Sequence, residues 1–194
     1  MDFIEKTLNI EKIYKGRIID LENLIVELPD GREAQREIVR HPGASMIVPI
    51  LNDRKIVLIR QFRKPLEKVY YEMPAGKLDN NENPLDCAVR ELKEETGYTA
   101  GKIQHILSTD MTPAFSDEIM HIYIATELIE GETQKDKDEF IETKIFSIEE
   151  LEKMVYSGEI TDAKTVIGVF IAERHLKPQS IFPPKSGETN GNIL

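Results

Sequence analysis

The stretch between Asn83 and Gly97 constrains the fold most, because both ends of a helix are marked in it. Asn83 is a favourable N-cap, Pro84 suits a first helical turn, and Gly97 can end a helix in the left-handed conformation. These signals predict a helix over residues 84–96. Apolar residues at helical spacing predict its buried stripe, which comprises Leu85, Ala88, Val89, Leu92 and Thr96.

The same helix gathers carboxylates on one flank. At about 100° per residue, Glu91 and Glu95 lie one turn apart, and Glu94 falls beside them. Like charges at this spacing cost roughly a few tenths of a kcal/mol per pair, and a bound divalent cation would reverse that sign. Oxygen-only ligands favour Mg²⁺ or Mn²⁺ over zinc, and Mg²⁺ commonly joins carboxylates to a substrate phosphate. The alternative interpretation of these glutamates is a solvated acidic face.

The surroundings of the helix favour the metal site. Gly76, then Glu82 after five residues, then the run from Arg90 to Tyr98 after seven more, match the Nudix box. The chain therefore resembles the Nudix hydrolases. The resemblance implies an α+β fold, in which a mixed sheet lies between helices in an α/β/α sandwich, and an N-terminal antiparallel hairpin or meander. It also implies metal-assisted hydrolysis of a nucleoside diphosphate that is linked to another group.

The resemblance further assigns roles within this segment. Arg90 would orient the carboxylate of Glu94, and Glu82 would support the site. Gly76 would let the loop approach the metal closely, although an ordinary turn glycine explains it equally well. The implied metal ligands are Glu91, Glu94, Glu95 and the carbonyl of Ala75.

Outside the box, the chain is similar to the ADP-ribose pyrophosphatase branch of this family from about Tyr14 to Phe170. The carrying segments are 61–65, 72–76, 112–118 and 162–165, with Thr-Pro-Ala at 112–114 in place of the usual Ser-Pro-Gly. This similarity implies Mg²⁺-dependent hydrolysis of ADP-ribose to AMP and ribose 5-phosphate, with Mn²⁺ as a substitute. The alternatives are another nucleoside diphosphate sugar, a dinucleotide, or a protein that binds ADP-ribose without cleaving it.

Charge composition indicates where an anionic substrate could be held. The chain has 25 basic and 35 acidic residues, a net charge of −10, so a diphosphate needs local cations in addition to a metal. Arg36, Arg40 and Arg63 are the candidates, and an ordinary surface charge is the alternative for each. By resemblance, the N-terminal strands reach across a homodimer, so that Arg36 and Glu37 would grip adenine. With no Trp present, the residue that stacks on adenine is Arg36 or one of Tyr14 and Phe3.

Hydrolysis also needs a base for the attacking water. The acidic segment from Asp136 to Glu139 lies where related enzymes carry the base on a loop, and Glu139 is our prediction. Asp138 and Glu142 are the alternatives for this role. A solvated loop without any catalytic role is the other explanation of the segment.

The rest of the chain reads as alternating strands and helices. Residues 45–51 and 55–62 are predicted hairpin partners across the turn-forming triplet 52–54. Further strands are predicted at 12–40 (as a hairpin or meander), 69–73, 103–107, 119–125 and 140–146, and further helices from Ser147 to about Tyr156 and from Asp162 to about Leu176. The predicted organisation is an N-terminal β subdomain over 1–42 for dimerisation and substrate contacts, a hydrolase domain over 43–177, and a mobile tail over 178–194.

Composition excludes several classes of function. The negative net charge disfavours partners such as nucleic acid or an anionic membrane surface, and the longest apolar run is only about six residues. Cys87 is the single cysteine, so no internal disulfide forms, and four scattered His do not complete a zinc cluster. These features predict a protein of the reducing cytoplasm whose partner is a small molecule.

Overall fold

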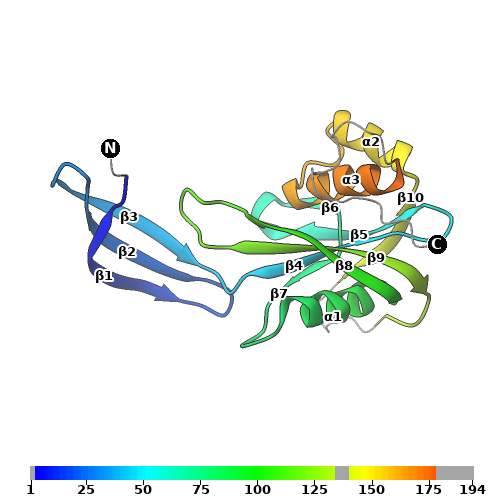
Figure 1. Cartoon of the computed structure of the whole chain (residues 1–194), viewed down its shortest axis with the longest axis horizontal. Coiled ribbons are helices and arrows are strands. Elements are labelled where there is room, and N and C mark those ends of the chain that lie inside the picture. Colours follow the sequence, from blue (N-terminus) through cyan, green and yellow to red (C-terminus); the bar gives the residue numbers. More distant parts are fainter. Residues whose placement is uncertain (1–2, 134–139, 178–194) are drawn as a thin grey trace, which may run out of the picture.

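The computed structural model describes residues 3–133 and 140–177. Its main body contains two sheets between helices (Figure 1). In the mixed sheet, neighbouring strands follow the order β7 (Ala75–Lys77), β4 (Ala44–Pro49), β9 (Ile119–Ile129) and β8 (Thr99–Asp110), with β4 and β9 parallel. In the antiparallel sheet, the order is β10 (Glu142–Phe146), β5 (Ile56–Arg63) and β6 (Lys68–Glu72). A short 3-10 helix, η1 (Lys64–Leu66), joins β5 to β6.

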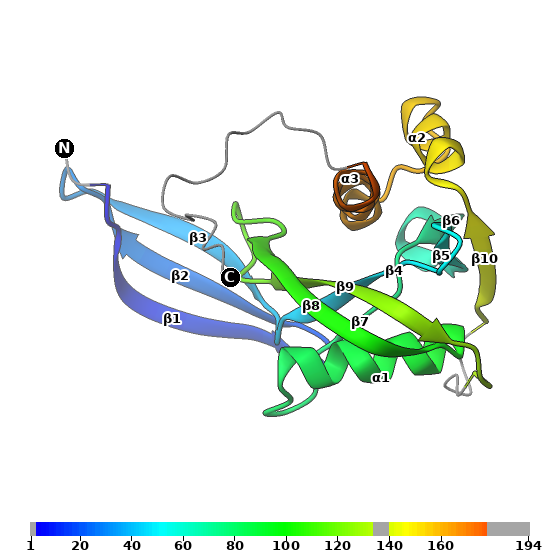
Figure 2. The ribbon, with the colours of Figure 1, turned by 45° about the vertical axis from the view of Figure 1, so that its right-hand side comes forward.

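Helices cover both faces of the sheets. One face carries α1 (Pro84–Thr96), and the other carries α2 (Ile148–Tyr156) and α3 (Ala163–Leu176) (Figures 1 and 2). The predicted caps are present, since Asn83 accepts from the backbone N–H of Leu85 at 2.9 Å and Gly97 has a φ of +80°. The α+β architecture with a mixed sheet between helices is confirmed. No helix in the described ranges is both long and apolar enough to cross a membrane.

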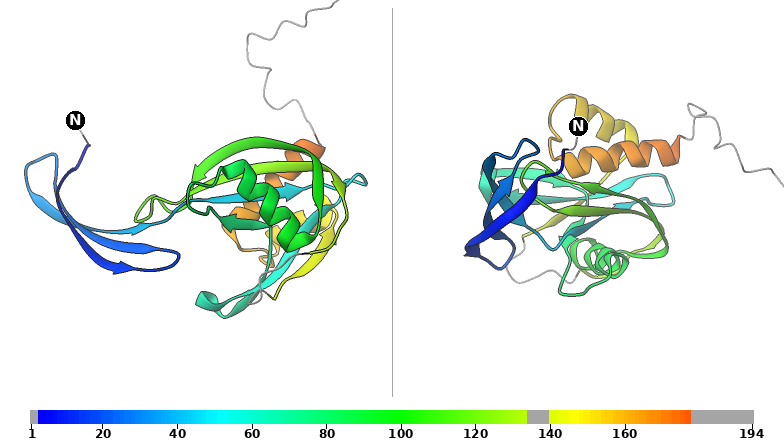
Figure 3. Two further views of the ribbon diagram at one scale, coloured as in Figure 1. Left: turned by 90° about the horizontal axis from the view of Figure 1, so that it is seen from below. Right: turned by 60° about the vertical axis from the view of Figure 1, so that its left-hand side comes forward.

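A separate sheet at the N-terminus extends to one side of this body (Figures 1 and 3). It consists of the antiparallel strands β1 (Lys6–Lys15), β2 (Asp20–Glu27) and β3 (Glu33–Arg40). Every residue of β1 is exposed, and β1 begins six residues before the predicted start at Lys12. The sheet is tied to the body where Val39 pairs with Ser116 and Arg40 forms an ion pair with Asp117 at 3.0 Å.

Two predictions about packing were wrong. The runs 45–51 and 55–62 form β4 and β5, which enter different sheets. Beside the turn they are joined by a bridge between Ile50 and Ile56 and by a hydrogen bond from the N–H of Leu51 to the carbonyl of Lys55 at 2.8 Å. Both runs are buried, so each finds partners on both edges instead of forming a two-stranded hairpin. On α1, Leu85 and Val89 are 41% and 48% exposed, while Glu95 is 3% exposed. Ala88, Leu92 and Thr96 are buried as predicted, whereas Cys87 and Glu95 complete the buried stripe in place of Leu85 and Val89.

Candidate active site

Gly76 lies in β7, and the side chain of Glu91 in α1 packs directly against it. A Cβ at position 76 would lie 1.7 Å from Oε1 of Glu91 and 2.0 Å from its Cδ. Both distances are far below contact distance, so no residue with a side chain fits here unless Glu91 moves. Gly76 is not among the glycines with positive φ, so it does not serve as a turn residue. The geometry supports a close approach of β7 to the Glu91 side chain, and the predicted approach of this loop to a metal stays a prediction.

Arg90 gathers three box carboxylates around one guanidinium group. Its Nε and Nη2 donate to the two oxygens of Glu82 at 2.9 and 3.0 Å, and its Nη1 donates to Glu91 at 2.6 Å and Glu94 at 3.0 Å. Hydrogen bonding from Arg90 lowers the pKa of Glu82 to about 2. A single guanidinium group therefore fixes the direction of three carboxylates.

Glu95 is buried and contacts Ala75, the residue before Gly76 in β7. Its Oε2 accepts the backbone N–H of Ala75 at 3.0 Å. This contact places Glu95 and Ala75, two of the predicted metal ligands, directly side by side. The predicted set Glu91, Glu94 and Glu95 is thus brought to one edge of α1 beside β7.

The donor chemistry of this edge fits a hard divalent cation. Its side-chain donors are carboxylate oxygens, and Gly76 leaves the approach to Glu91 open. Among the described residues, no group of three or more His, Cys, Asp or Glu is arranged as a metal site as it stands. The reason is visible in the contacts, because Arg90 draws Glu91 and Glu94 toward Glu82 while Glu95 bonds to Ala75.

A cavity of about 240 Å³ opens directly beside Ala75 and Gly76. Three basic side chains line its wall, Arg63 from β5, Lys77 from β7 and Lys164 from α3. Arg63 was predicted from the sequence as a substrate contact, whereas Lys164 was not singled out, although it belongs to the Asp-Ala-Lys-Thr segment that carried part of the family resemblance. The cavity thus places these cations beside Ala75 and Gly76, the two residues that the box glutamates Glu95 and Glu91 approach.

Arg63 and Lys164 are both bound to one buried carboxylate. Glu72, which is 1% exposed, accepts from Nε and Nη2 of Arg63 at 2.8 and 2.9 Å and from Nζ of Lys164. Burial raises the pKa of Glu72, but the hydrogen bonds from Arg63 and the charge of Lys164 outweigh it, so the net pKa lies below the usual value. Lys164 also donates to Asp162, the N-cap of α3, at 2.9 Å.

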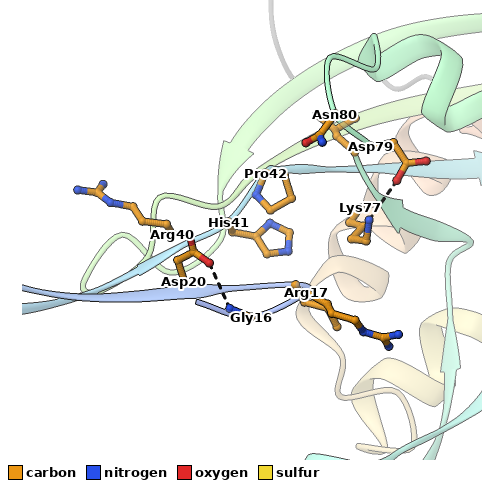
Figure 4. A pocket seen from close by; sticks show the side chains of 11 residues that line it. Gly16, Arg17, Asp20, Arg40, His41, Pro42, Lys77, Asp79 and Asn80 are labelled. Carbon is orange, nitrogen blue, oxygen red and sulfur yellow. Dashed lines mark hydrogen bonds and ion pairs between the residues drawn. The ribbon is translucent and has the colours of Figure 1, made fainter. Parts of the chain in front are cut away.

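The other predicted substrate contacts lie in or beside the N-terminal sheet. Arg36 is held by an ion pair with Glu5 at 2.5 Å, and neither it nor the exposed Glu37 lines the cavity beside the box. Arg40 pairs with Glu22 and Asp117. It borders a different, polar cavity of about 360 Å³ between the N-terminal sheet and the loop after Gly76. Figure 4 shows its guanidinium group directed away from Lys77 and Asp79.

The predicted catalytic base lies outside the described residues. Glu139 and Asp138 both fall between residues 133 and 140. Glu142 is described at the start of β10, where it forms ion pairs with Arg60 at 3.4 Å and Lys144 at 2.5 Å. It lines a further cavity, beside Phe62 and Phe140, and not the one beside Gly76.

Cys87 lies in α1 next to the box but is fully buried. Its thiol donates to the carbonyls of Gly76 and Lys77 at 3.5 Å, and burial raises its pKa to about 12. A thiol with this pKa stays protonated at neutral pH, so Cys87 serves a structural role and not that of a nucleophile.

Comparison with known proteins shows where such a site occurs. The family model described as the NUDIX domain matches residues 39–166. An ADP-ribose pyrophosphatase of Bacillus subtilis is 46% identical over 167 residues, which cover 85% of this chain and 90% of that protein. A methanol dehydrogenase activator of Bacillus methanolicus is 44% identical, with 86% and 91% covered. A crystal structure of an ADP compounds hydrolase has the same fold, with a TM-score of 0.81, 24% identity, and 93% and 98% covered.

Proposed function

This chain belongs to the Nudix family of hydrolases, and from that premise we propose that it cleaves the diphosphate of ADP-ribose to give AMP and ribose 5-phosphate. One observation carries the proposal. The box glutamates meet the Ala75–Gly76 strand, which lines a cavity together with the cations Arg63, Lys77 and Lys164. Relatives 46% and 35% identical are named ADP-ribose pyrophosphatases.

The carboxylates define the metal part of the proposed mechanism. Glu91, Glu94, Glu95 and the carbonyl of Ala75 would hold Mg²⁺, with Mn²⁺ as a substitute. The cation, when bound, neutralises diphosphate charge and lowers the pKa of a water molecule. Arg90 would orient the carboxylates, a role that its contacts with Glu82, Glu91 and Glu94 support.

The remaining steps belong to the chain's own groups. Glu139 would accept the proton of the attacking water, with Asp138 and Glu142 as alternatives. Oxygen of that water would bond to the adenosyl phosphorus, and the bond from this phosphorus to the bridging oxygen would break. The leaving group is ribose 5-phosphate, and Arg63 would balance the charge of the diphosphate during the reaction.

A direct assay tests the proposal. Purified protein incubated with ADP-ribose and Mg²⁺ should release AMP, measured by chromatography, and fresh metal-loaded protein that releases none would refute it. Because relatives 32% identical are named GDP-mannose pyrophosphatases, GDP-mannose and a dinucleotide belong in a panel that compares kcat/KM. A protein that binds ADP-ribose without releasing AMP would instead match the binding module.

Charge removal in the box provides the matched mutational test. We predict that Glu91→Gln and Glu95→Gln each lower kcat by orders of magnitude, while the melting temperature stays the same or rises because like-charge repulsion is relieved. Glutamine at position 95 can still accept the N–H of Ala75. The control is Asp86→Asn, an exposed acidic residue of the same helix, which should leave kcat unchanged. If the box substitutions unfold the protein, those carboxylates are structural.

The N-terminal sheet completes the proposal. We infer that residues 1–42 form a subdomain for dimerisation, separate from a hydrolase domain over 43–177, and that the partner's copy brings Arg36 and Glu37 toward adenine. Support comes from the exposed apolar side chains of this sheet, which are Ile4, Leu8, Ile10, Ile13, Tyr14, Ile18 and Ile19. The predicted tail over 178–194 lies outside the described residues, and the cytoplasmic location stays a prediction.

A further inference from the structure

Lys164 occupies an unusual position for a lysine. Its side chain is only 12% exposed, at the first turn of α3. It lines the cavity beside Ala75 and Gly76, and it also lines a neighbouring cavity of about 360 Å³ that contains Tyr70 and Thr161. Lys164 and Arg63 are the two residues shared by both cavities, so they form the wall between them.

The local charge balance does not require this lysine for Glu72 alone. Glu72 already receives two hydrogen bonds from Arg63, which is the strong, bidentate form of such a pair. An ammonium group has three N–H donors, and the structure gives two of them partners, Glu72 and Asp162. The third donor has no partner among the described residues, so Lys164 retains capacity for an anion in the cavity.

The other cations near the box are less suited to that role. Lys77 lines the cavity beside Gly76, but it forms an ion pair with Asp79 at 3.1 Å and does not line the second cavity. Arg40 is occupied by Glu22 and Asp117 and does not line the cavity beside Gly76. In a chain of net charge −10, an anionic ligand at the wall shared by the two cavities therefore meets Arg63 and Lys164.

We propose that Lys164 contacts the diphosphate of the substrate as the second cation beside Arg63, and that Glu72 is the positioning residue that holds both. This inference rests on the proposed function. Glu72 fixes Arg63 from β5 and Lys164 from α3 at one point, although Glu72 and Lys164 are 92 residues apart in the chain. The two cations are thereby set in place before substrate arrives, which lowers the entropy lost on binding.

The experiment measures binding apart from turnover. The ligand is an ADP-ribose analogue in which a methylene group replaces the bridging oxygen of the diphosphate. In the presence of Mg²⁺ it is titrated in a calorimeter into wild type, Lys164→Met and Lys164→Arg. We expect Lys164→Met to weaken binding about tenfold or more, as for other lost charge-assisted contacts, and Lys164→Arg to recover part of the loss. With ADP-ribose itself, Lys164→Met should raise KM more than it lowers kcat.

A matched control separates substrate contact from stability. Lys177 is also a lysine paired with two carboxylates, those of Glu149 and Glu152, but it lies at the other end of α3. Lys177→Met should leave the dissociation constant and KM unchanged. Lys164→Met could also disturb Glu72. The single variant Glu72→Gln is therefore compared with the double variant Glu72→Gln, Lys164→Met, and the double variant should bind the analogue more weakly than the single one.

The outcomes are distinguishable. A lower melting temperature for Lys164→Met with an unchanged dissociation constant would make Lys164 a purely structural residue and overturn the inference alone. Equal binding by Glu72→Gln with and without Lys164→Met would overturn it as well. If wild type does not bind the analogue, the proposed function fails and the inference fails with it.

Discussion

At the scale of single residues, the geometry of the site depends on the absence of a side chain at Gly76 as well as on the carboxylates. Glu91 occupies the space that a Cβ at position 76 would need. Arg90 then holds the carboxylates of Glu91, Glu94 and Glu82 by hydrogen bonds from one guanidinium group. The box is therefore a set of mutual constraints, and a change at any member should be felt by the others.

The first prediction concerns Gly76→Ala. The new methyl group must displace Glu91, because the required separation of 1.7 Å is far below contact distance. We expect kcat/KM for ADP-ribose to fall by orders of magnitude and Mg²⁺ affinity to weaken, while the chain stays folded because a flexible side chain can move aside. Magnesium titration calorimetry and a circular dichroism melt measure the two effects. Full activity in Gly76→Ala would show that Glu91 does not need its observed position.

The second prediction concerns pH. Hydrogen bonding from Arg90 lowers the pKa of Glu82 from 4.5 to about 2, so the folded state favours the charged form. The stability from this pair is fully present above pH 4.5 and is lost as pH falls toward 2. The difference in unfolding free energy between wild type and Glu82→Gln should therefore shrink over that window. Urea unfolding at pH 6, 4 and 3 measures it, and a constant difference would argue against the pair.

At the scale of elements, the start of α3 is fastened to the end of β6. Asp162 caps α3 by accepting the backbone N–H of Thr165 at 3.0 Å. The hydroxyl of Thr165 donates to Asp162 at 2.6 Å and accepts the backbone N–H of Met73 at 2.9 Å. Met73 is followed by Pro74 and Ala75, so the cap of α3 and the strand β7 of the candidate site share one hydrogen-bonded connection.

The third prediction removes this connection with little change of shape. Thr165→Val keeps the volume but leaves the buried N–H of Met73 without its acceptor. Such a loss costs about 1–3 kcal/mol, and we expect the free energy of unfolding to fall by that amount in urea. The control, Thr99→Val on an exposed strand position, should change it by less than about 0.5 kcal/mol. Equal effects in the two variants would mean that the connection contributes nothing.

At the scale of the whole molecule, the N-terminal sheet contributes little to the core of the body. Only Leu24 and Val26 of its residues are buried, and the apolar side chains of β1 lie at the surface. An exposed sheet with apolar residues is a common site of association between subunits. This arrangement is the basis for the proposed dimer.

The fourth prediction tests that dimer. Ile10→Asp combined with Ile13→Asp places two charges on β1, where the side chains are 51% and 53% exposed. We expect sedimentation to show a dimer for wild type and a monomer for the double variant, with a similar circular dichroism spectrum because neither side chain belongs to the core. Lys12→Glu on the same strand is the control for added charge. A wild type that sediments as a monomer would exclude this interface.

What the sequence determined by itself was local. The caps at Asn83 and Gly97 defined α1, and glutamate spacing on a helix was enough to place Glu91, Glu94 and Glu95 together, because helical geometry fixes neighbours three and four residues apart. Spacing of the box residues then indicated the family. These results needed no knowledge of what packs against the helix.

What only the tertiary structure decided was long-range. In the structure, β4 and β5 belong to different sheets, and Leu85 and Val89 are exposed. Glu72 contacts Lys164, which lies 92 residues further along the chain. Strand partners and buried faces depend on which surfaces remove most apolar area from water while every buried polar group finds a partner. That balance is settled over the whole chain at once, and therefore no local pattern in the sequence records it.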